Sequence, residues 1–205
     1  MIQENIDTVI FDFGGVLINI DYHKTIDAFK ELGIEDFEER YSQADQTSLF
    51  NDLEIGEISA QRFINELLHF LPQGTSPNQV VHAWNAMLLD VPKSGIDLLQ
   101  GLKGKYRLFL LSNTNEIHIP RALVEWNKTS DIDFYSCFEH VYLSHEMGMR
   151  KPNEEIFQRV CRERNIQPEN ALFIDDSSQH IKGAQKAGLN TVHLTSEVSL
   201  LSVFS

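Results

Sequence analysis

Five short apolar runs, separated by helical patterns, constrain the fold of this chain more than any other feature. The runs lie at 8–13, 107–112, 140–144, 171–175 and 191–194. Their length and nearly continuous apolar character are typical of strands buried on both faces of a sheet. Apolar residues at helical spacing appear between runs, at 154–164 and 178–187. Strands that alternate with helices predict an α/β fold, with a parallel sheet flanked by helices.

The segment from about 22 to 89 interrupts this alternation. It contains several helical patterns and no convincing strand, and the strand pattern resumes soon after it. We therefore expect an α/β core of residues 1–19 and 91–205, with a small helical cap of residues 20–90 inserted after the first strand. A separate helical domain is the alternative interpretation. The acidic stretch at 35–40 is expected to be a solvated helix.

Charge and composition exclude several classes of partner. The 205 residues carry a formal net charge of -13, from 30 acidic against 17 Lys and Arg residues. Because no basic cluster offsets this charge, we expect no nucleic-acid partner. No run reaches the roughly 18 apolar residues of a membrane span, and the two cysteines do not form a disulfide framework. We expect a cytoplasmic protein with no membrane contact; the sequence leaves its oligomeric state open.

Polar side chains stand where several of the expected strands end. Asp12, Ser112 and the pair Asp175 and Asp176 close three of the apolar runs, and Lys151 follows a fourth after a short loop. Each of these residues alone is as typical of a turn, a helix cap or a solvated surface. Ligands of parallel α/β sheets bind outside the carboxyl ends of the strands. The joint placement of these residues therefore predicts a single site.

The residue types at this predicted site suit the transfer of a phosphoryl group. Carboxylates at two strand ends are the hard oxygen ligands that Mg²⁺ prefers, and the cation would offset the repulsion between a phosphate and Asp12. Asp12 can then attack phosphorus as a covalent nucleophile. Lys151 and Ser112 are expected to bind the phosphate oxygens, and we expect Asn113 to contact the substrate beside them.

The same segments resemble the four motifs of the haloacid dehalogenase superfamily. The motifs correspond to the apolar run ending in Asp12, to Ser112–Asn113, to Lys151–Pro152 and to the apolar run ending in Asp175–Asp176. The resemblance covers essentially the whole chain and implies a Rossmann-like parallel sheet with a helical cap. DFGGV at 12–16, LSNTN at 111–115 and LSHEMGMRKP at 143–152 look more specifically like the bacterial glucose-1-phosphate phosphatase branch, which is similar to the phosphatase domain of bifunctional epoxide hydrolases.

This resemblance implies a role for each site residue. Asp12 would be the nucleophile that forms an aspartyl-phosphate, and Ser112 and Lys151 would bind the phosphate. The implied ligands of Mg²⁺ are Asp12, the carbonyl of Gly14, and the pair Asp175 and Asp176. The expected partner is therefore a small-molecule phosphate ester, and the expected cofactor is Mg²⁺.

Two positions depart from the pattern of the superfamily. Gly14 stands where most of its phosphatases carry a second Asp, which protonates the leaving alkoxide. Such acid–base help is typically worth about 10²–10⁴-fold in rate. A sugar 1-phosphate would tolerate the loss, because its anomeric leaving group is less basic than a simple alkoxide. His180 stands where relatives often have Asn. We expect it to cap its helix or lie on the surface of the first turn; support of the metal carboxylates and donation of a proton are the alternatives.

These features favour a Mg²⁺-dependent phosphomonoester hydrolase that acts on a small phosphorylated metabolite, such as glucose 1-phosphate. Asp21, Tyr22 and His23 lie close enough in the chain to contact that substrate. A non-catalytic module that binds a phosphometabolite or a protein is the alternative that Gly14 favours. A haloacid dehalogenase is disfavoured, because the adjacent carboxylates at 175–176 need a cation to offset them. A phosphomutase generally relies on the missing second Asp.

Overall fold

The fold is a single parallel sheet with helices on both faces. A computed structural model describes residues 3–34, 37 and 49–205. Within them, five parallel strands have the order β3-β2-β1-β4-β5. The strands are β1 (Thr8–Phe11), β2 (Arg107–Ser112), β3 (His140–Leu143), β4 (Ala171–Asp175) and β5 (Asn190–His193). The predicted Rossmann-like α/β fold is confirmed.

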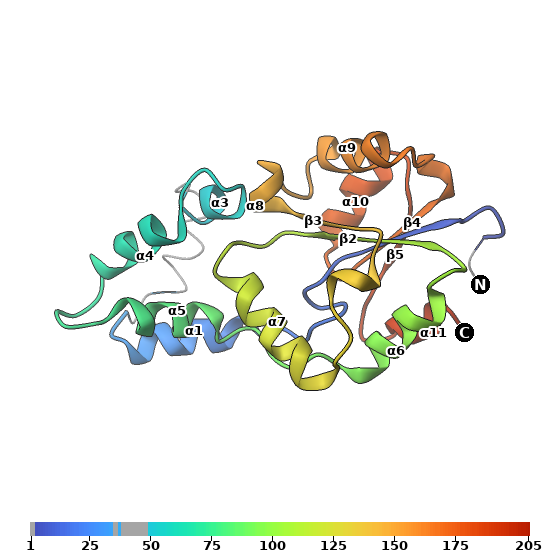
Figure 1. Ribbon diagram of the computed structural model, residues 1–205. Helices are drawn as coiled ribbons and strands as arrows, with labels where there is room; N and C mark the ends of the chain where they lie inside the picture. Colours follow the sequence, from blue (N-terminus) through green and yellow to red (C-terminus); the bar gives the residue numbers. More distant parts are fainter. Residues whose placement is uncertain (1–2, 35–36, 38–48) are drawn as a thin grey trace.

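Helices cover the two faces of the sheet as separate layers (Figure 1). The layer on one face consists of α9 (Glu154–Arg164) and α10 (Ser178–Lys186). The layer on the other face consists of α6 (Lys93–Leu102), α7 (His118–Thr129) and α11 (Leu200–Val203). The remaining helical segments here are α8 (Ser144–Met147) and two 3-10 turns, Tyr135–Cys137 and Pro168–Asn170. No helix of the described residues has both the length and the apolar composition of a membrane span.

The central strand β1 has no alternation of apolar and polar residues, because both of its faces are buried. Val9 and Phe11 pack into the layer of α6 and α7, whereas Ile10 packs into the layer of α9 and α10, and all three are fully buried. A strand between two helical layers needs apolar residues on both faces. The sheet core therefore extends above and below β1.

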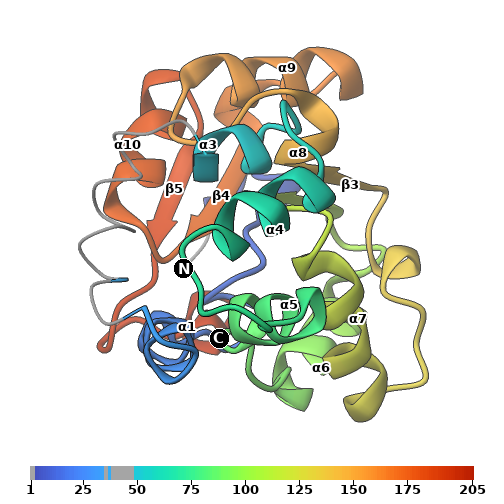
Figure 2. The same cartoon turned by 90° about the vertical axis from the view of Figure 1, so that its left-hand side faces the viewer.

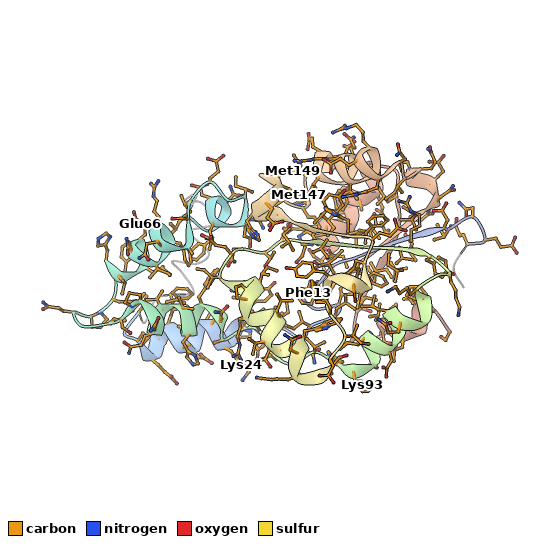
Figure 3. All side chains as sticks on the ribbon, in the orientation of Figure 1. Phe13, Lys24, Glu66, Lys93, Met147 and Met149 are labelled. Atoms are coloured by element: carbon orange, nitrogen blue, oxygen red, sulfur yellow. The ribbon has the colours of Figure 1, made fainter. Side chains whose placement is uncertain are left out.

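The strand β1 ends two residues before the predicted position. Asp12 still donates its backbone N–H to the carbonyl of Ile174, at 2.9 Å, but Phe13 then leaves the sheet. Its ring is buried against Phe134, with centroids 5.0 Å apart, and Figure 3 shows it in the layer beneath the sheet. The buried Phe13 anchors the turn and leaves Asp12 at the end of the strand.

A second group of helices lies beyond the carboxyl ends of the strands and faces the viewer in Figure 2. It consists of α1 (Tyr22–Glu31), α3 (Leu49–Glu54), α4 (Ala60–Leu68) and α5 (Pro77–Asn85). Phe29, Phe63 and Trp84 are buried in its own apolar cluster. We call these helices the cap; the predicted division into 1–19 with 91–205 and 20–90 stays a prediction. The stretch at 35–40 falls, except for Phe37, outside the described residues.

Two of the contacts between the cap and the core lie at Gly56 and His118. Gly56 has a φ of +72° and lies against the backbone of His145, where an added Cβ would overlap the carbonyl oxygen. His118 of α7 stacks on Trp84, with ring centroids 5.0 Å apart, and its Nε2 donates to the carbonyl of Trp84 at 3.1 Å. Burial lowers the pKa of His118 to about 4, so this ring is neutral. These contacts hold the cap over the edge of the sheet.

Candidate active site

The strand ends bring most of the predicted site residues to one edge of the sheet. Asp12 directly follows β1, Ser112 is the last residue of β2, and Asp175 is the last residue of β4. All three are buried, whereas the neighbouring Asp176 is exposed. Parallel strands with matched register place their carboxyl ends side by side, which explains this convergence.

Lys151 joins two of these carboxylates. Its Nζ lies 2.8 Å from Oδ1 of Asp12 and 2.8 Å from Oδ2 of Asp175, and its side chain is 0% exposed. A buried ammonium requires such partners, because an unpaired charge in the protein interior is costly. The ammonium group therefore fixes the separation of the two acids.

Asn113 holds the backbone of Lys151 in place. The Asn113 amide donates to the carbonyl of Lys151 at 2.9 Å, and its Oδ1 accepts from the Lys151 N–H at 2.9 Å. Its side chain is thus engaged with the protein, although the residue also lines the cavity above Asp12. Substrate contact by Asn113 stays a prediction.

The loop before Lys151 is anchored in the core. Met147 ends α8 and Met149 follows it, and both pack against the cluster between the sheet, α9 and α10 (Figure 3). Gly183 of α10 lies directly against this loop, because an added Cβ would overlap the carbonyl oxygen of Pro152. Helix α10 therefore supports the segment that carries Lys151.

We expect Gly183→Ala to lower the free energy of unfolding by about 1–3 kcal/mol, since the new methyl group forces α10 and the loop apart. Chemical denaturation measures this loss. Gly101→Ala is the matched control, because nothing lies within 4 Å of an added Cβ on this helical glycine. Its stability should be unchanged or higher by less than about 1 kcal/mol. Equal effects of the two substitutions on the free energy of unfolding would contradict the close approach of Gly183 to the carbonyl of Pro152.

The charges at the strand ends are unbalanced. Burial raises the pKa of Asp12 to about 6, although Lys151 opposes the shift. Burial also raises the pKa of Asp175, but Lys151 and His180 outweigh it and bring the value to about 2. Nδ1 of His180 lies 3.0 Å from both oxygens of Asp175. Asp176 is exposed as a residue, but partial desolvation of its carboxyl group, together with the charge of Asp175, raises its pKa. Three carboxylates thus face one ammonium.

This excess of carboxylates fits a divalent cation. Ligand atoms of Asp12, Asp175 and His180 all lie within 4.8 Å of one another. Mg²⁺ takes one or two carboxylates and keeps several waters, so the two buried acids suffice as protein ligands. Gly14 and Asp176 line the same cavity as Asp12, and their roles as ligands stay predictions.

The cavity above Asp12 has a volume of about 570 Å³ and is bordered by both the core and the cap. Its size lies in the range of about 300–1,000 Å³ that small-molecule sites occupy. Tyr22, named from the sequence, lines it, whereas the carboxylate of Asp21 instead accepts the His23 N–H at the start of α1.

Sequence reasoning missed five residues that border this cavity: Ile20, Phe50, Glu54, Arg150 and Ser177. Two of them belong to a cap helix that carried no sequence motif. Arg150 directly precedes Lys151, and this adjacency was the one signal available for it.

Comparisons with known proteins show the family to which the chain is similar. A family model described as haloacid dehalogenase-like hydrolase matches residues 6–188. The chain is 31% identical to D-ribitol-5-phosphate phosphatase of Bacteroides thetaiotaomicron over 91% of this chain and 90% of that protein. An HAD family enzyme from the same organism, solved with magnesium and inorganic phosphate, is 36% identical with a TM-score of 0.90, covering 98% of this chain and 100% of that chain. A predicted HAD-like family hydrolase from Porphyromonas gingivalis is 33% identical with a TM-score of 0.86, over 97% and 96% of the two chains.

The chain belongs to the haloacid dehalogenase-like hydrolase family, as its sequence motifs predicted. Within that family it is a magnesium-dependent phosphatase, a phosphoric monoester hydrolase. A dehalogenase structure is only 20% identical, with a TM-score of 0.65 over 95% of this chain and 87% of that chain, and this likeness concerns the fold alone. The enzyme class and the magnesium cofactor inferred from the sequence are confirmed.

Proposed function

We propose that this phosphatase hydrolyses a small phosphorylated sugar or polyol through an aspartyl-phosphate on Asp12. The observation that carries the proposal is the position of Asp12. This residue is 6% exposed, borders the 570 Å³ cavity and is held at 2.8 Å by the buried ammonium of Lys151. The relative that hydrolyses ribitol 5-phosphate supports a hydroxylated substrate of this size.

In the proposed reaction, a carboxylate oxygen of Asp12 attacks phosphorus, and the bond from phosphorus to the ester oxygen breaks. Lys151 and Ser112 hold the phosphate oxygens, where negative charge accumulates. The leaving alkoxide takes up a proton from a water molecule, because Gly14 offers no carboxyl group. Water then attacks the phosphorus of the acyl-phosphate, which releases inorganic phosphate and restores the carboxylate. Bound Mg²⁺, held by Asp12 and Asp175, with Asp176 and the Gly14 carbonyl as further ligands, supplies positive charge that offsets the phosphate.

The two substrate candidates differ in how strongly their leaving groups need a proton. Gly14 offers no carboxyl group, and this favours a leaving group of low basicity, such as the anomeric oxygen of glucose 1-phosphate. The relative with 31% identity acts instead on ribitol 5-phosphate, whose leaving group is an ordinary alkoxide. Both esters fit the proposed class, so both belong in the test.

The test measures phosphate release from glucose 1-phosphate, D-ribitol 5-phosphate and p-nitrophenyl phosphate, with Mg²⁺ and with chelator. We expect release only with Mg²⁺, and a higher kcat/KM for one of the two hydroxylated esters than for the aryl ester. Release from the aryl ester alone would contradict the proposed substrate class. Binding of Mg²⁺ and phosphate without turnover of any ester would instead favour a binding module.

A further inference from the structure

We propose that Arg150 and Glu54 form a recognition pair that selects a neutral, hydroxylated leaving group and disfavours a second anionic group. The inference rests on the proposed function, because it concerns the part of the same substrate that does not react. It assigns the choice of substrate to two residues outside the strand-end motifs.

The pair joins the core to the cap at the wall of the cavity. Glu54 is the last residue of α3, and Arg150 lies in the loop just before Lys151. Nε of Arg150 lies 3.1 Å from Oε2 of Glu54, and the two side chains are 27% and 25% exposed. Both border the cavity that contains Asp12. A ligand bound there therefore meets a cationic and an anionic group that lie side by side at the cavity wall.

The guanidinium of Arg150 has unused hydrogen-bonding capacity. Guanidinium carries five N–H donors, yet within the described residues Arg150 has only its ion pair with Glu54. Its Nε is shielded from solvent and lies against Glu54, so the unused donors are the N–H groups of its two terminal nitrogens. Arg107, by contrast, donates to the carboxylate of Glu139 and to the carbonyl of Arg164. Arg150 thus presents donors to the cavity that an oxygen-rich ligand can satisfy.

The opposite charges of the pair define the ligand chemistry. A hydroxyl group both donates and accepts, so a chain of hydroxyls can accept from Arg150 and donate to Glu54. A second phosphate or a carboxylate would suit Arg150 but would face Glu54, Asp12 and Asp176, which surround the same cavity. An alkyl group would leave the arginine donors unsatisfied, and this costs binding free energy. A neutral polyol or sugar satisfies both members of the pair.

The adjacency of Arg150 and Lys151 places this recognition close to the reacting phosphate. The Lys151 ammonium contacts Asp12, and the neighbouring Arg150 borders the cavity that contains Asp12. Sites built to hydrogen-bond a substrate hydroxyl strongly reject the analogue that lacks it. The pair should therefore determine how strongly the enzyme prefers an ester with hydroxyl groups over one of the same carbon skeleton without them.

The experiment compares esters that differ only in their hydroxyl groups. D-ribitol 5-phosphate is paired with pentyl phosphate, and glucose 1-phosphate with cyclohexyl phosphate, and the ratio of kcat/KM is measured within each pair. In Glu54→Gln and in Arg150→Gln, we expect the ratio for the better-hydrolysed hydroxylated ester to fall at least about tenfold. Glu54→Gln should also raise the relative rate of phosphate release from phosphoglycerate, an ester whose carboxylate is a second anionic group. Glu139→Gln, which breaks an Arg–Glu pair away from the cavity, should keep the wild-type ratios.

A double variant distinguishes a role of the pair in substrate recognition from a role only in holding the cap against the core. Glu54→Arg combined with Arg150→Glu restores the opposite charges between cap and core but places a carboxylate next to Lys151. We expect it to regain the thermal stability lost in the single variants without regaining selectivity. Restored selectivity, or unchanged ratios in the single variants, overturns the inference and leaves the proposed function intact. A wild-type protein that hydrolyses none of the esters refutes the proposed function itself.

Discussion

Asp12→Asn is expected to lower kcat/KM for every phosphate ester by at least about 10⁴-fold, because an amide oxygen cannot replace a carboxylate as the covalent nucleophile. The substitution keeps the size of the side chain and an acceptor for Lys151, whose Nζ lies 2.8 Å from Asp12. It also removes one carboxylate from a site where three face one ammonium. The loss should therefore appear in catalysis while the protein stays folded.

Phosphate release and the mass of acid-quenched protein together check this expectation. Wild-type protein mixed with substrate should carry a phosphoryl group on the peptide that contains Asp12, and the variant should carry none. Asp97→Asn is the control, since Asp97 is an exposed residue of α6 that pairs with Lys93. Retention of a tenth of the wild-type activity by Asp12→Asn would rule out a covalent role for this residue.

Lys151→Met is the substitution with the largest expected effect on stability. It should lower the free energy of unfolding by about 3–5 kcal/mol, because it leaves two buried carboxylates without their shared cation. The ammonium is 0% exposed and lies 2.8 Å from both Asp12 and Asp175. Methionine fills a similar volume, so little of the loss should come from a cavity.

Denaturant unfolding in the presence of a chelator measures this loss. Added Mg²⁺ should restore part of the stability, since an ion that binds only the folded state stabilises it. The control is Lys93→Met, because the side chains of Lys93 and its partner Asp97 are 71% and 61% exposed. An exposed pair of this kind contributes no more than about 1 kcal/mol. Similar losses in the two variants would show that Lys151 has no special electrostatic role.

The sheet and its strand-end residues were predictable because both follow from local patterns. A buried parallel strand needs a continuous apolar run, and the residue after the run must lie at the carboxyl edge. Asp12, Ser112 and Asp175 were found in this way. The end of β1 was misplaced by two residues because Phe13 is apolar for a different reason: it packs beneath the sheet.

Contacts between separate elements were not predictable from these patterns. Glu54 and Arg150 meet only because α3 of the cap lies against the loop before Lys151, and no periodicity within either segment encodes that placement. Gly183 likewise reads as an unfavourable residue in a helix until the carbonyl of Pro152 is seen against it. A single sequence specifies the faces of each element, whereas the pairing of faces emerges only in three dimensions.

The side chain of Asn113 does for Lys151 what a neighbouring strand would do, since it pairs with both backbone groups of that residue. Sheet-like bonding thus continues past the end of β2 into a loop, where two hydrogen bonds hold the backbone of Lys151. Arg150, one residue earlier, is tied instead to the cap. Two consecutive residues of one loop therefore have their partners in different parts of the enzyme, Lys151 in the core and Arg150 in the cap. In the proposed mechanism, substitutions in the cap change the partner of Arg150, and with it the range of esters accepted, while Lys151 stays where it is.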